Sequence, residues 1–154
     1  MSQLDTAPIF PLHPDGWPKA RGYTNGFRVQ SGCDLICVAG QIGWDTDGKF
    51  PGDGDVVAQF SQALDNFLAV VAAGGGKPTD VVSMTIYVTD MDQYIRGRSE
   101  LGRIWQQRFG RHYPAMALVG VSALVEKLAL VEIQGLAAIS ASDVTAESHN
   151  GCER

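Results

Sequence analysis

Basic residues are scarce in this chain of 154 residues. It carries 12 Lys and Arg against 17 Asp and Glu, which gives a formal net charge of -5 at pH 7. Sequence-independent binding of nucleic acid needs a surplus of Lys and Arg side chains to neutralise the phosphates. The composition therefore argues against nucleic acid as a partner.

Long apolar runs are also missing, since no stretch approaches the roughly 18 to 20 residues that a membrane span requires. Residues 1–17 lack the basic stretch followed by an apolar core that is typical of a secretory signal. We therefore expect no membrane partner and a cytoplasmic location.

Cysteine is rare, with Cys33, Cys37 and Cys152 as the three examples. An odd number at this spacing fits no disulfide framework, and Cys33 and Cys37 lack the second pair that would complete a zinc site. We interpret all three as reduced thiols, because disulfides are rare in the cytosol. The sequence thus predicts no metal site.

A chain of 154 residues fits one domain with a single core. Four of the 7 prolines fall within the first 20 residues, so residues 1–20 are predicted to be an irregular lead-in. A single domain is expected over residues 21–139, with order beginning near Tyr23. Residues 140–154 have few large apolar side chains, which predicts a flexible tail.

Apolar periodicity predicts two helices, over residues 55–73 and 92–109, because apolar residues recur there at three and four positions. Strands are predicted in residues 26–30 and 34–42, joined by a hairpin turn, and in residues 80–90, 115–123 and 128–139. The order β-β-α-β-α-β-β predicts an α+β fold, in which two helices cover one face of a mixed sheet.

A carboxylate interrupts the last predicted strand, where Glu132 stands between Val131 and Ile133. Because side chains alternate along a strand, Glu132 lies on the uncovered face if its two neighbours meet the helices. Met116 and Leu118 alternate in the preceding strand, and we expect them on that same uncovered face. Exposed apolar surface costs about 25 cal/mol per Å², so we expect this face to pack against another copy of the chain.

Five stretches together carry a resemblance to a known family. They are "GYTNGFRV", "VAGQIGWD", "DVVAQFSQALDNFLAVVAAGG", "DVVSMTIYVTDMDQY" and "YPAMALVGVSALVEKLALVEIQGLA". With them, the sequence resembles the reactive-intermediate deaminase (Rid, or YjgF) family from about Gly22 to Ala138. The resemblance implies a chorismate-mutase-like fold and a homotrimer with a central barrel and small-molecule clefts between subunits. It also implies hydrolysis of imines and enamines to a carbonyl compound and ammonia, without metal or cofactor.

The resemblance also implies roles for residues that match the family pattern. Tyr23 stands at the position of the cleft tyrosine, and it can donate a hydrogen bond or pack on a conjugated substrate. Gly40 stands where a glycine offers its backbone to the ligand, and Glu132 where a glutamate holds the attacking water. These positions predict Glu132 and Tyr23 as catalytic residues and Gly40 as a substrate-binding one.

Other positions depart from the family pattern. Active members usually have Pro-Ala-Arg where this chain has Pro114-Ala115-Met116, so the arginine that binds the substrate carboxylate is missing. Leu118 replaces a common cysteine, and Arg98 stands where an asparagine is usual. We expect Arg98, Met116 and Leu118 to contact a substrate that bears a carboxylate, with Arg98 as a relocated anchor.

The leading hypothesis is therefore a Rid-like deaminase acting on an imine, an enamine or a conjugated amine, with 2-aminomuconate as one candidate. The alternative is a non-catalytic trimer that binds a small metabolite in the same cleft. Plainer interpretations also stay open. Glu132 can be a structural acid that forms a salt bridge across the subunit interface. Arg98 can be a solvated helix residue, and Met116 and Tyr23 can be packing residues.

Overall fold

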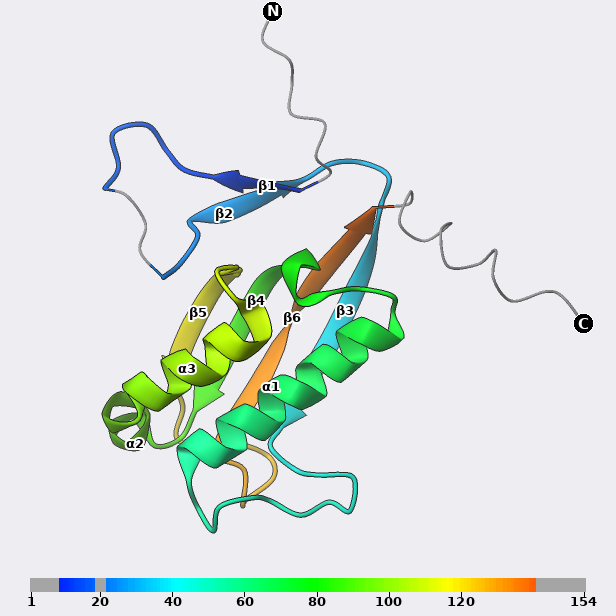
Figure 1. Cartoon of the computed structure of the whole chain (residues 1–154). Helices are drawn as coiled ribbons and strands as arrows, with labels where there is room; N and C mark the ends of the chain where they lie inside the picture. The colour runs from blue at the N-terminus through cyan, green and yellow to red at the C-terminus, as the bar shows by residue number, and fades with distance from the viewer. Residues whose placement is uncertain (1–8, 19–21, 141–154) are drawn as a thin grey trace, which may run out of the picture.

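A four-stranded mixed sheet forms the centre of the molecule (Figure 1). The computed structural model describes residues 9–18 and 22–140. The strand order is β3-β6-β4-β5, where β4 and β5 run parallel and the other neighbours run antiparallel. The strands are β3 (Cys33–Ile42), β4 (Val81–Val88), β5 (Ala115–Gly120) and β6 (Val131–Ser140).

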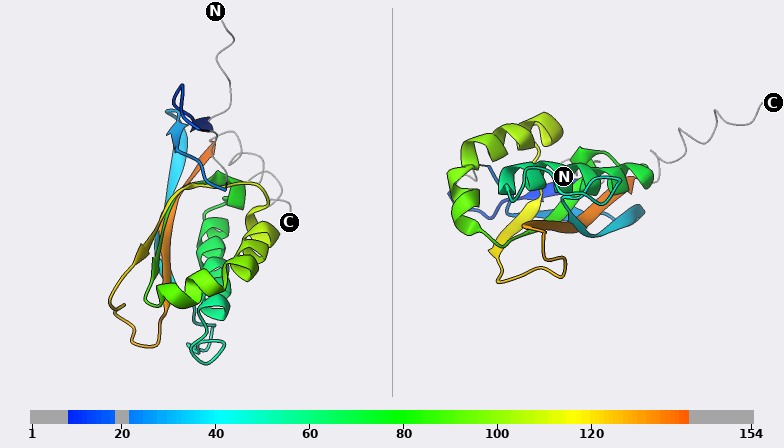
Figure 2. Two further views of the ribbon diagram at one scale, coloured as in Figure 1. Left: turned by 90° about the vertical axis from the view of Figure 1, so that its left-hand side faces the viewer. Right: turned by 90° about the horizontal axis from the view of Figure 1, so that it is seen from below.

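Helices cover one face of this sheet, as the turned views in Figure 2 show. They are α1 (Val56–Ala73), α2 (Met91–Arg96) and α3 (Arg98–Phe109), with a short 3-10 helix, η1 (Pro78–Asp80), before β4. The other face carries no helix within the described residues. The predicted α+β architecture, with a mixed sheet covered on one side, is thus confirmed.

Helix α1 forms where the apolar periodicity predicted it. The side chain of Asp55 accepts a hydrogen bond from the backbone N–H of Val57 at 2.8 Å, which caps the helix start, and Gly74 follows the last turn. Its apolar stripe packs on the sheet, where Leu64 and Phe67 are fully buried. By length and composition α1 would suffice to cross a membrane, but core helices of soluble proteins pass the same test.

The second predicted helix is divided in two, because the chain leaves helical geometry at Gly97. This residue has φ -82° and ψ 1°, and it ends α2 and precedes α3. A Cβ atom built on Gly97 would come within 2.6 Å of a methyl group of Val57 in α1. The prediction of one continuous helix over residues 92–109 was therefore wrong, and the close approach of α1 explains why a glycine stands at the break.

The N-terminal region also differs from the prediction. Strand β2 (Gly26–Val29) pairs with β1 (Ile9–Leu12) and not with β3, so the predicted hairpin between residues 26–30 and 34–42 is wrong. Part of the predicted irregular lead-in is thus a strand. Pro11 lies within β1 opposite Phe27, a position that a two-stranded ribbon tolerates because each strand has a free edge.

A histidine links this ribbon to the main body. The ring of His112 lies 5.8 Å from that of Phe27 and 6.3 Å from that of Phe109, and its Nε2 is 2.7 Å from the carbonyl oxygen of Val81. His112 therefore has a structural role that its isolated place in the sequence did not suggest. The predicted tail lies outside the described residues, apart from Ser140 at the end of β6.

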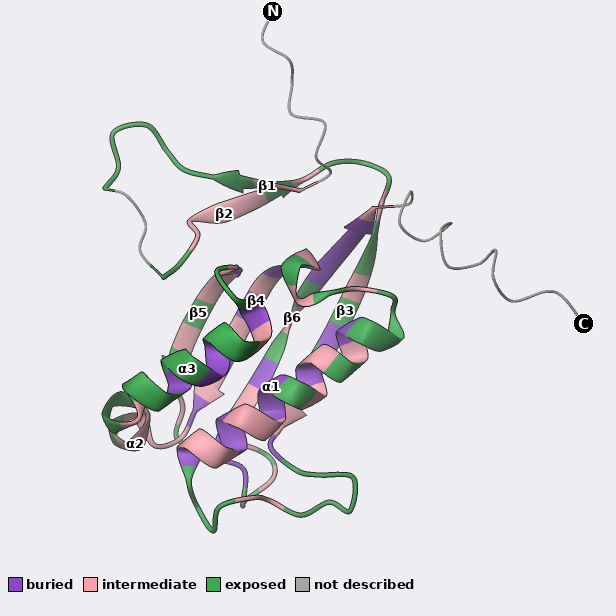
Figure 3. Ribbon diagram, viewed as in Figure 1, coloured by how far each residue is buried: buried purple, intermediate pink, exposed green. Residues whose placement is uncertain are grey.

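The two faces of the sheet differ in burial. Figure 3 marks the buried, intermediate and exposed residues along the described chain. On the helix face, Met84, Ile86, Val131 and Ile133 are at most 2 % exposed. On the open face, apolar side chains stay in contact with solvent. They include Leu35, Val119 and Leu136, which are 59 %, 40 % and 38 % exposed.

Candidate functional site

Glu132 lies on the open face, as its alternation with Val131 and Ile133 predicted. Its strand neighbour there is Tyr87 of β4, whose hydroxyl accepts a hydrogen bond from the side-chain amide of Gln134 at 2.8 Å. Glu132 is half-buried. Within residues 9–18 and 22–140, no salt bridge or hydrogen bond engages its carboxylate. No ion pair within the described residues therefore accounts for Glu132, and the interpretation of Glu132 as an acid salt-bridged across a subunit interface stays a prediction.

Gly40 makes room for this carboxylate. A Cβ atom built on Gly40 would overlap the Glu132 carboxylate, and the backbone there has no positive φ that would call for glycine. The pairing of β3 with β6 is also irregular between Val38 and Gln41, which brackets Gly40. The missing side chain at Gly40 therefore leaves space around a carboxylate that faces outward.

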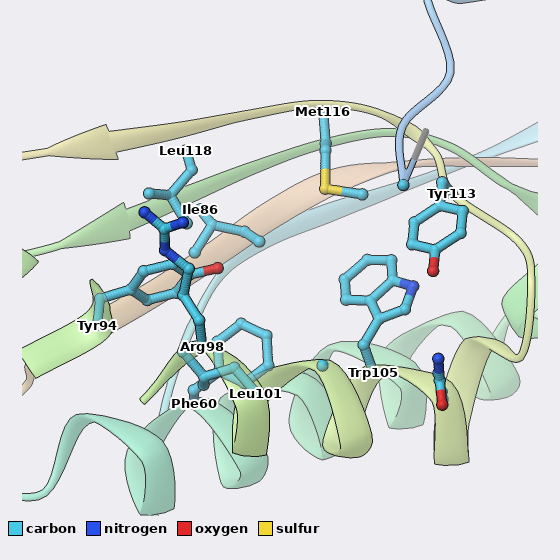
Figure 4. Close-up of a pocket in the computed structure, with 12 residues that line it drawn as sticks. Phe60, Ile86, Tyr94, Arg98, Leu101, Trp105, Tyr113, Met116 and Leu118 are labelled. Carbon is cyan, nitrogen blue, oxygen red and sulfur yellow. The ribbon is translucent and has the colours of Figure 1, made fainter. Parts of the chain in front are cut away.

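A pocket with a volume of about 290 Å³ lies on the opposite, helix-covered face of the sheet (Figure 4). We call it the α3 pocket, because α3 forms one wall and β4 and β5 form the other. Ile86, Met116 and Leu118 line it from the sheet, and Tyr94, Leu101 and Trp105 line it from the helices. Its wall is thus mainly apolar and aromatic.

Stacked rings stiffen one end of the α3 pocket. Trp105 stacks on Phe109 with ring centroids 4.3 Å apart, and its ring is nearly parallel to that of Tyr113 at 6.0 Å. The indole N–H donates to the carbonyl oxygen of His112 at 3.1 Å. Because the polar atom of Trp105 is thus satisfied by backbone, the ring offers an apolar surface to the cavity.

Arg98 lies at the other end, beside Tyr94 and Leu118, as Figure 4 shows. Burial raises the pKa of Tyr94, and the nearby positive charge of Arg98 partly offsets that rise. The neighbouring helix arginines behave differently, since Arg103 pairs with Glu100 and neither Arg103 nor Arg96 lines the pocket. Arg98 is therefore the helix arginine placed to meet a ligand in this cavity.

The six predicted site residues do not come together in one protomer. Arg98, Met116 and Leu118 line the α3 pocket, whereas Glu132 and Gly40 lie on the open face. Tyr23 is 49 % exposed and follows Gly22, which lines the pocket.

The expectation that Met116 and Leu118 share the open face with Glu132 was wrong. In the parallel pairing of β4 with β5, Met116 lies beside Met84 and Leu118 beside Ile86, and these partners face the helices. The sequence alone did not indicate that β5 pairs with β4 instead of β6. It also gave no role to Gly102 and Tyr94, which line the same cavity.

Potential metal ligands are scattered in the described part of the chain, where no group of three His, Cys, Asp or Glu side chains is arranged to hold an ion. The chemistry that the site can support therefore rests on a carboxylate, an arginine and an apolar cavity.

Comparison with known proteins gives consistent matches over most of the chain. Residues 18–139 match the family model described as endoribonuclease L-PSP. Protein DfrA of Myxococcus xanthus is 37% identical over 127 residues, which cover 82% of this chain and 92% of that protein. The 2-iminobutanoate/2-iminopropanoate deaminase of Dermatophagoides farinae is 31% identical over 111 residues, covering 72% and 82%.

Comparison with solved structures points to the same family. The crystal structure of YyfB from Yersinia pestis, a Rid-family protein of unknown function, superposes with a TM-score of 0.73 at 25% identity, covering 86% of this chain and all of that one. The mixed sheet with helices on one face is thus the fold of that family, and Glu132 lies within the matched residues. By sequence and by fold, this chain belongs to the Rid/YjgF family.

Proposed function

We propose that this protein hydrolyses an imine, an enamine or a conjugated amine to a carbonyl compound and ammonia, with Glu132 as the base that holds the attacking water. The observation that carries the proposal is the Glu132 carboxylate, half-buried beside Gly40 and without an ion-pair partner among the described residues. Names of relatives add support, since several are called imine or reactive-intermediate deaminases.

The proposed reaction needs no group beyond water and a proton carrier. Water adds to the carbon of the protonated imine while Glu132 accepts one of its protons, and a neutral carbinolamine forms. Glu132 then passes this proton to the nitrogen. The C–N bond breaks as the hydroxyl group gives its proton to Glu132, and the carbonyl compound and ammonia leave. An enamine enters the same sequence once its carbon is protonated. A positioned carboxylate base of this kind typically contributes about 100-fold to 10,000-fold in rate.

We further propose that the complete site forms between copies of the chain in a homotrimer. Glu132 and the α3 pocket lie on opposite faces of one sheet, so a small substrate cannot contact both within a single protomer. The open face also exposes Leu35, Val119 and Leu136, which favours its burial against another copy. A cleft between subunits would bring Glu132 of one copy toward the α3 pocket of another.

The proposal is tested by ammonia release from imines made in place by an amino-acid oxidase, measured above spontaneous hydrolysis, and from 2-aminomuconate. Glu132→Gln should lower the rate at least about 100-fold. Gly40→Ala should also lower it while the fold persists, because the new methyl group must displace the flexible Glu132 carboxylate.

Glu126→Gln is the matched control, since it makes the same chemical change in a loop acid. Its side-chain oxygen accepts from the backbone of Leu128, and an amide oxygen can still do so. Its activity should stay near that of the wild type. Full activity in Glu132→Gln, or no ammonia from any substrate in the panel, would remove deamination as the function.

A binding role without turnover is the second candidate, and one observation favours it. The α3 pocket is lined within one protomer, whereas Glu132 lies on the other face. A metabolite-binding trimer would show ligand-induced thermal stabilisation with no ammonia release, and Glu132→Gln would leave that stabilisation unchanged.

Ribonuclease activity, which the description of the family model suggests, is not what we propose. The net charge of -5 is unfavourable for a phosphate backbone. RNA cleavage that survived Glu132→Gln and fell steeply with salt would be the contrary result.

A further inference from the structure

The size of the α3 pocket indicates the size of its ligand. An apolar cavity of about 150 Å³ in a protein core holds one benzene molecule. The α3 pocket, at about 290 Å³, is nearly twice as large. It has room for a six-membered ring and a short chain. A two- or three-carbon acid would leave much of its apolar wall facing water or empty space.

A glycine in the middle of α3 keeps this pocket open. Gly102 lines the cavity, and a Cβ atom built on it would meet no atom within 4 Å among the described residues. Glycine inside a helix costs about 1 kcal/mol relative to alanine. Among the described residues, no neighbouring atom is close enough to Gly102 to require a glycine there. Space at the pocket wall, beside Leu101 and Trp105, is the feature that this glycine provides.

The charge of the pocket indicates the polarity of its ligand. Among the described residues that line it, Arg98 is the single charged side chain, and no acid neutralises it. Arg98 lies at one end with Tyr94, and Trp105, Tyr113 and Met116 lie toward the other (Figure 4). The pocket is therefore cationic at one end and mainly aromatic and apolar toward the other. Gln106 and Tyr113 also line it and add polar groups without charge.

We propose that the α3 pocket binds a monocarboxylate that carries an aromatic ring or an apolar group of similar size, with the carboxylate on Arg98 and the ring toward Trp105 and Met116. As a statement about the substrate, this rests on the proposed function, and it names the imine or enamine of an aryl-substituted acid. Small imino acids fill too little of the cavity, and the second charge of a dicarboxylate such as 2-aminomuconate would meet its apolar end.

The test is direct binding of substrate-like acids to the full chain, measured by calorimetry. The wild type should bind 3-phenylpropanoate about thirtyfold more tightly than propanoate, because the ring buries apolar surface. Hexanedioate, a dicarboxylate, should bind no better than propanoate. Equal affinity for 3-phenylpropanoate and propanoate would overturn the proposal.

Two pairs of variants locate the site. Gly102→Leu should weaken 3-phenylpropanoate binding at least about tenfold by filling the cavity, with Gly102→Ala as the smaller step. Neither should unfold the chain, since both residues are better helix formers than glycine. Arg98→Met should weaken the binding of 3-phenylpropanoate about threefold and leave the binding of 3-phenylpropan-1-ol unchanged. Arg96→Met should change the binding of neither compound. Unchanged binding in Gly102→Leu would place the ligand elsewhere.

Turnover separates this proposal from the proposed function. Selective binding of 3-phenylpropanoate without ammonia release from any imine would reject the deaminase and keep the pocket assignment. Ammonia release from small and aryl-substituted imines at equal efficiency would keep the deaminase and reject the pocket as its specificity site.

Discussion

Helices α1 and α3 cover the same face of one sheet, yet they close against it differently. Under α1, the side chains of Leu64, Phe67 and Val71 are fully buried. Under α3, a cavity of about 290 Å³ remains between the helix and strands β4 and β5. The difference indicates that these residues of α1 pack closely on the sheet, while α3 leaves an open cavity against β4 and β5.

The largest expected effect comes from a substitution in the fully buried core under α1. Phe67→Ala should lower the free energy of unfolding by about 4 kcal/mol, because it removes a fully buried ring and leaves a cavity. Met116→Ala, in the half-buried wall of the α3 pocket, should cost clearly less. Urea unfolding of both variants checks this ranking. Equal losses would mean that the two helices contribute alike.

Gly135 of β6, which lies beside Phe67 in the core under α1, provides the next test. A Cβ atom on Gly135 would overlap the backbone carbonyl of Ser83 and come within 3.1 Å of Phe67. Gly135→Ala should therefore lower the free energy of unfolding by about 2 kcal/mol, as overpacking typically does. Thermal melts compare it with wild type. An unchanged melting temperature would show that β4 and β6 can separate without cost.

Arg108 ties the two helices together, and its loss should have an intermediate effect. Its guanidinium contacts both carboxylate oxygens of Asp65 in α1 at 2.5 and 2.7 Å and the hydroxyl of Ser61 at 2.9 Å. The hydrogen bond to Asp65 raises the pKa of Arg108. Arg108→Met should cost about 1 kcal/mol and reduce the salt dependence of stability. A salt dependence like that of the wild type would argue against the pair.

Gly102→Ala should stabilise the protein, in contrast to Gly135→Ala. The new methyl group meets no atom within 4 Å, and alanine is the better helix former by about 1 kcal/mol. Urea unfolding should show a gain of up to about that size. A loss of stability would reveal a contact at Gly102 outside the described protomer.

The smallest effect concerns Tyr94 at high pH. Burial raises the pKa of Tyr94, so the folded state favours the neutral phenol more than the unfolded state does. This contribution to stability is fully present below the unfolded pKa of about 10 and is lost as the pH rises through the folded pKa. Between pH 8 and 11, the wild type should lose more stability than Tyr94→Phe. Parallel pH profiles would contradict the assignment.

Periodicity in the sequence correctly predicted α1, the four sheet strands and the helix-covered face of β6. It failed where contacts between distant segments decide the structure. The break at Gly97 depends on the approach of Val57, and the pairing of β2 depends on a strand that contains Pro11. Neither contact leaves a local periodic pattern.

The candidate site was predictable by residue type more than by arrangement. Alternation in β6 placed Glu132 on the open face correctly, because its own strand neighbours decided it. Met116 and Leu118 were placed on the wrong face, because their orientation depends on the parallel register with β4. Arg98 was selected among three helix arginines by position. It lines the α3 pocket, whereas Arg96 and Arg103 do not, and its role as an anchor stays a prediction.

The separation of Glu132 from the α3 pocket has an evolutionary consequence. The acid and the pocket wall lie on opposite faces of the sheet, so within one protomer a mutation that reshapes the pocket does not contact Glu132. A single codon change at Gly102 can install alanine or valine and narrow the cavity, while the residues around Glu132 in the same protomer stay the same. The size of the pocket can thus change in evolution without any substitution beside Glu132.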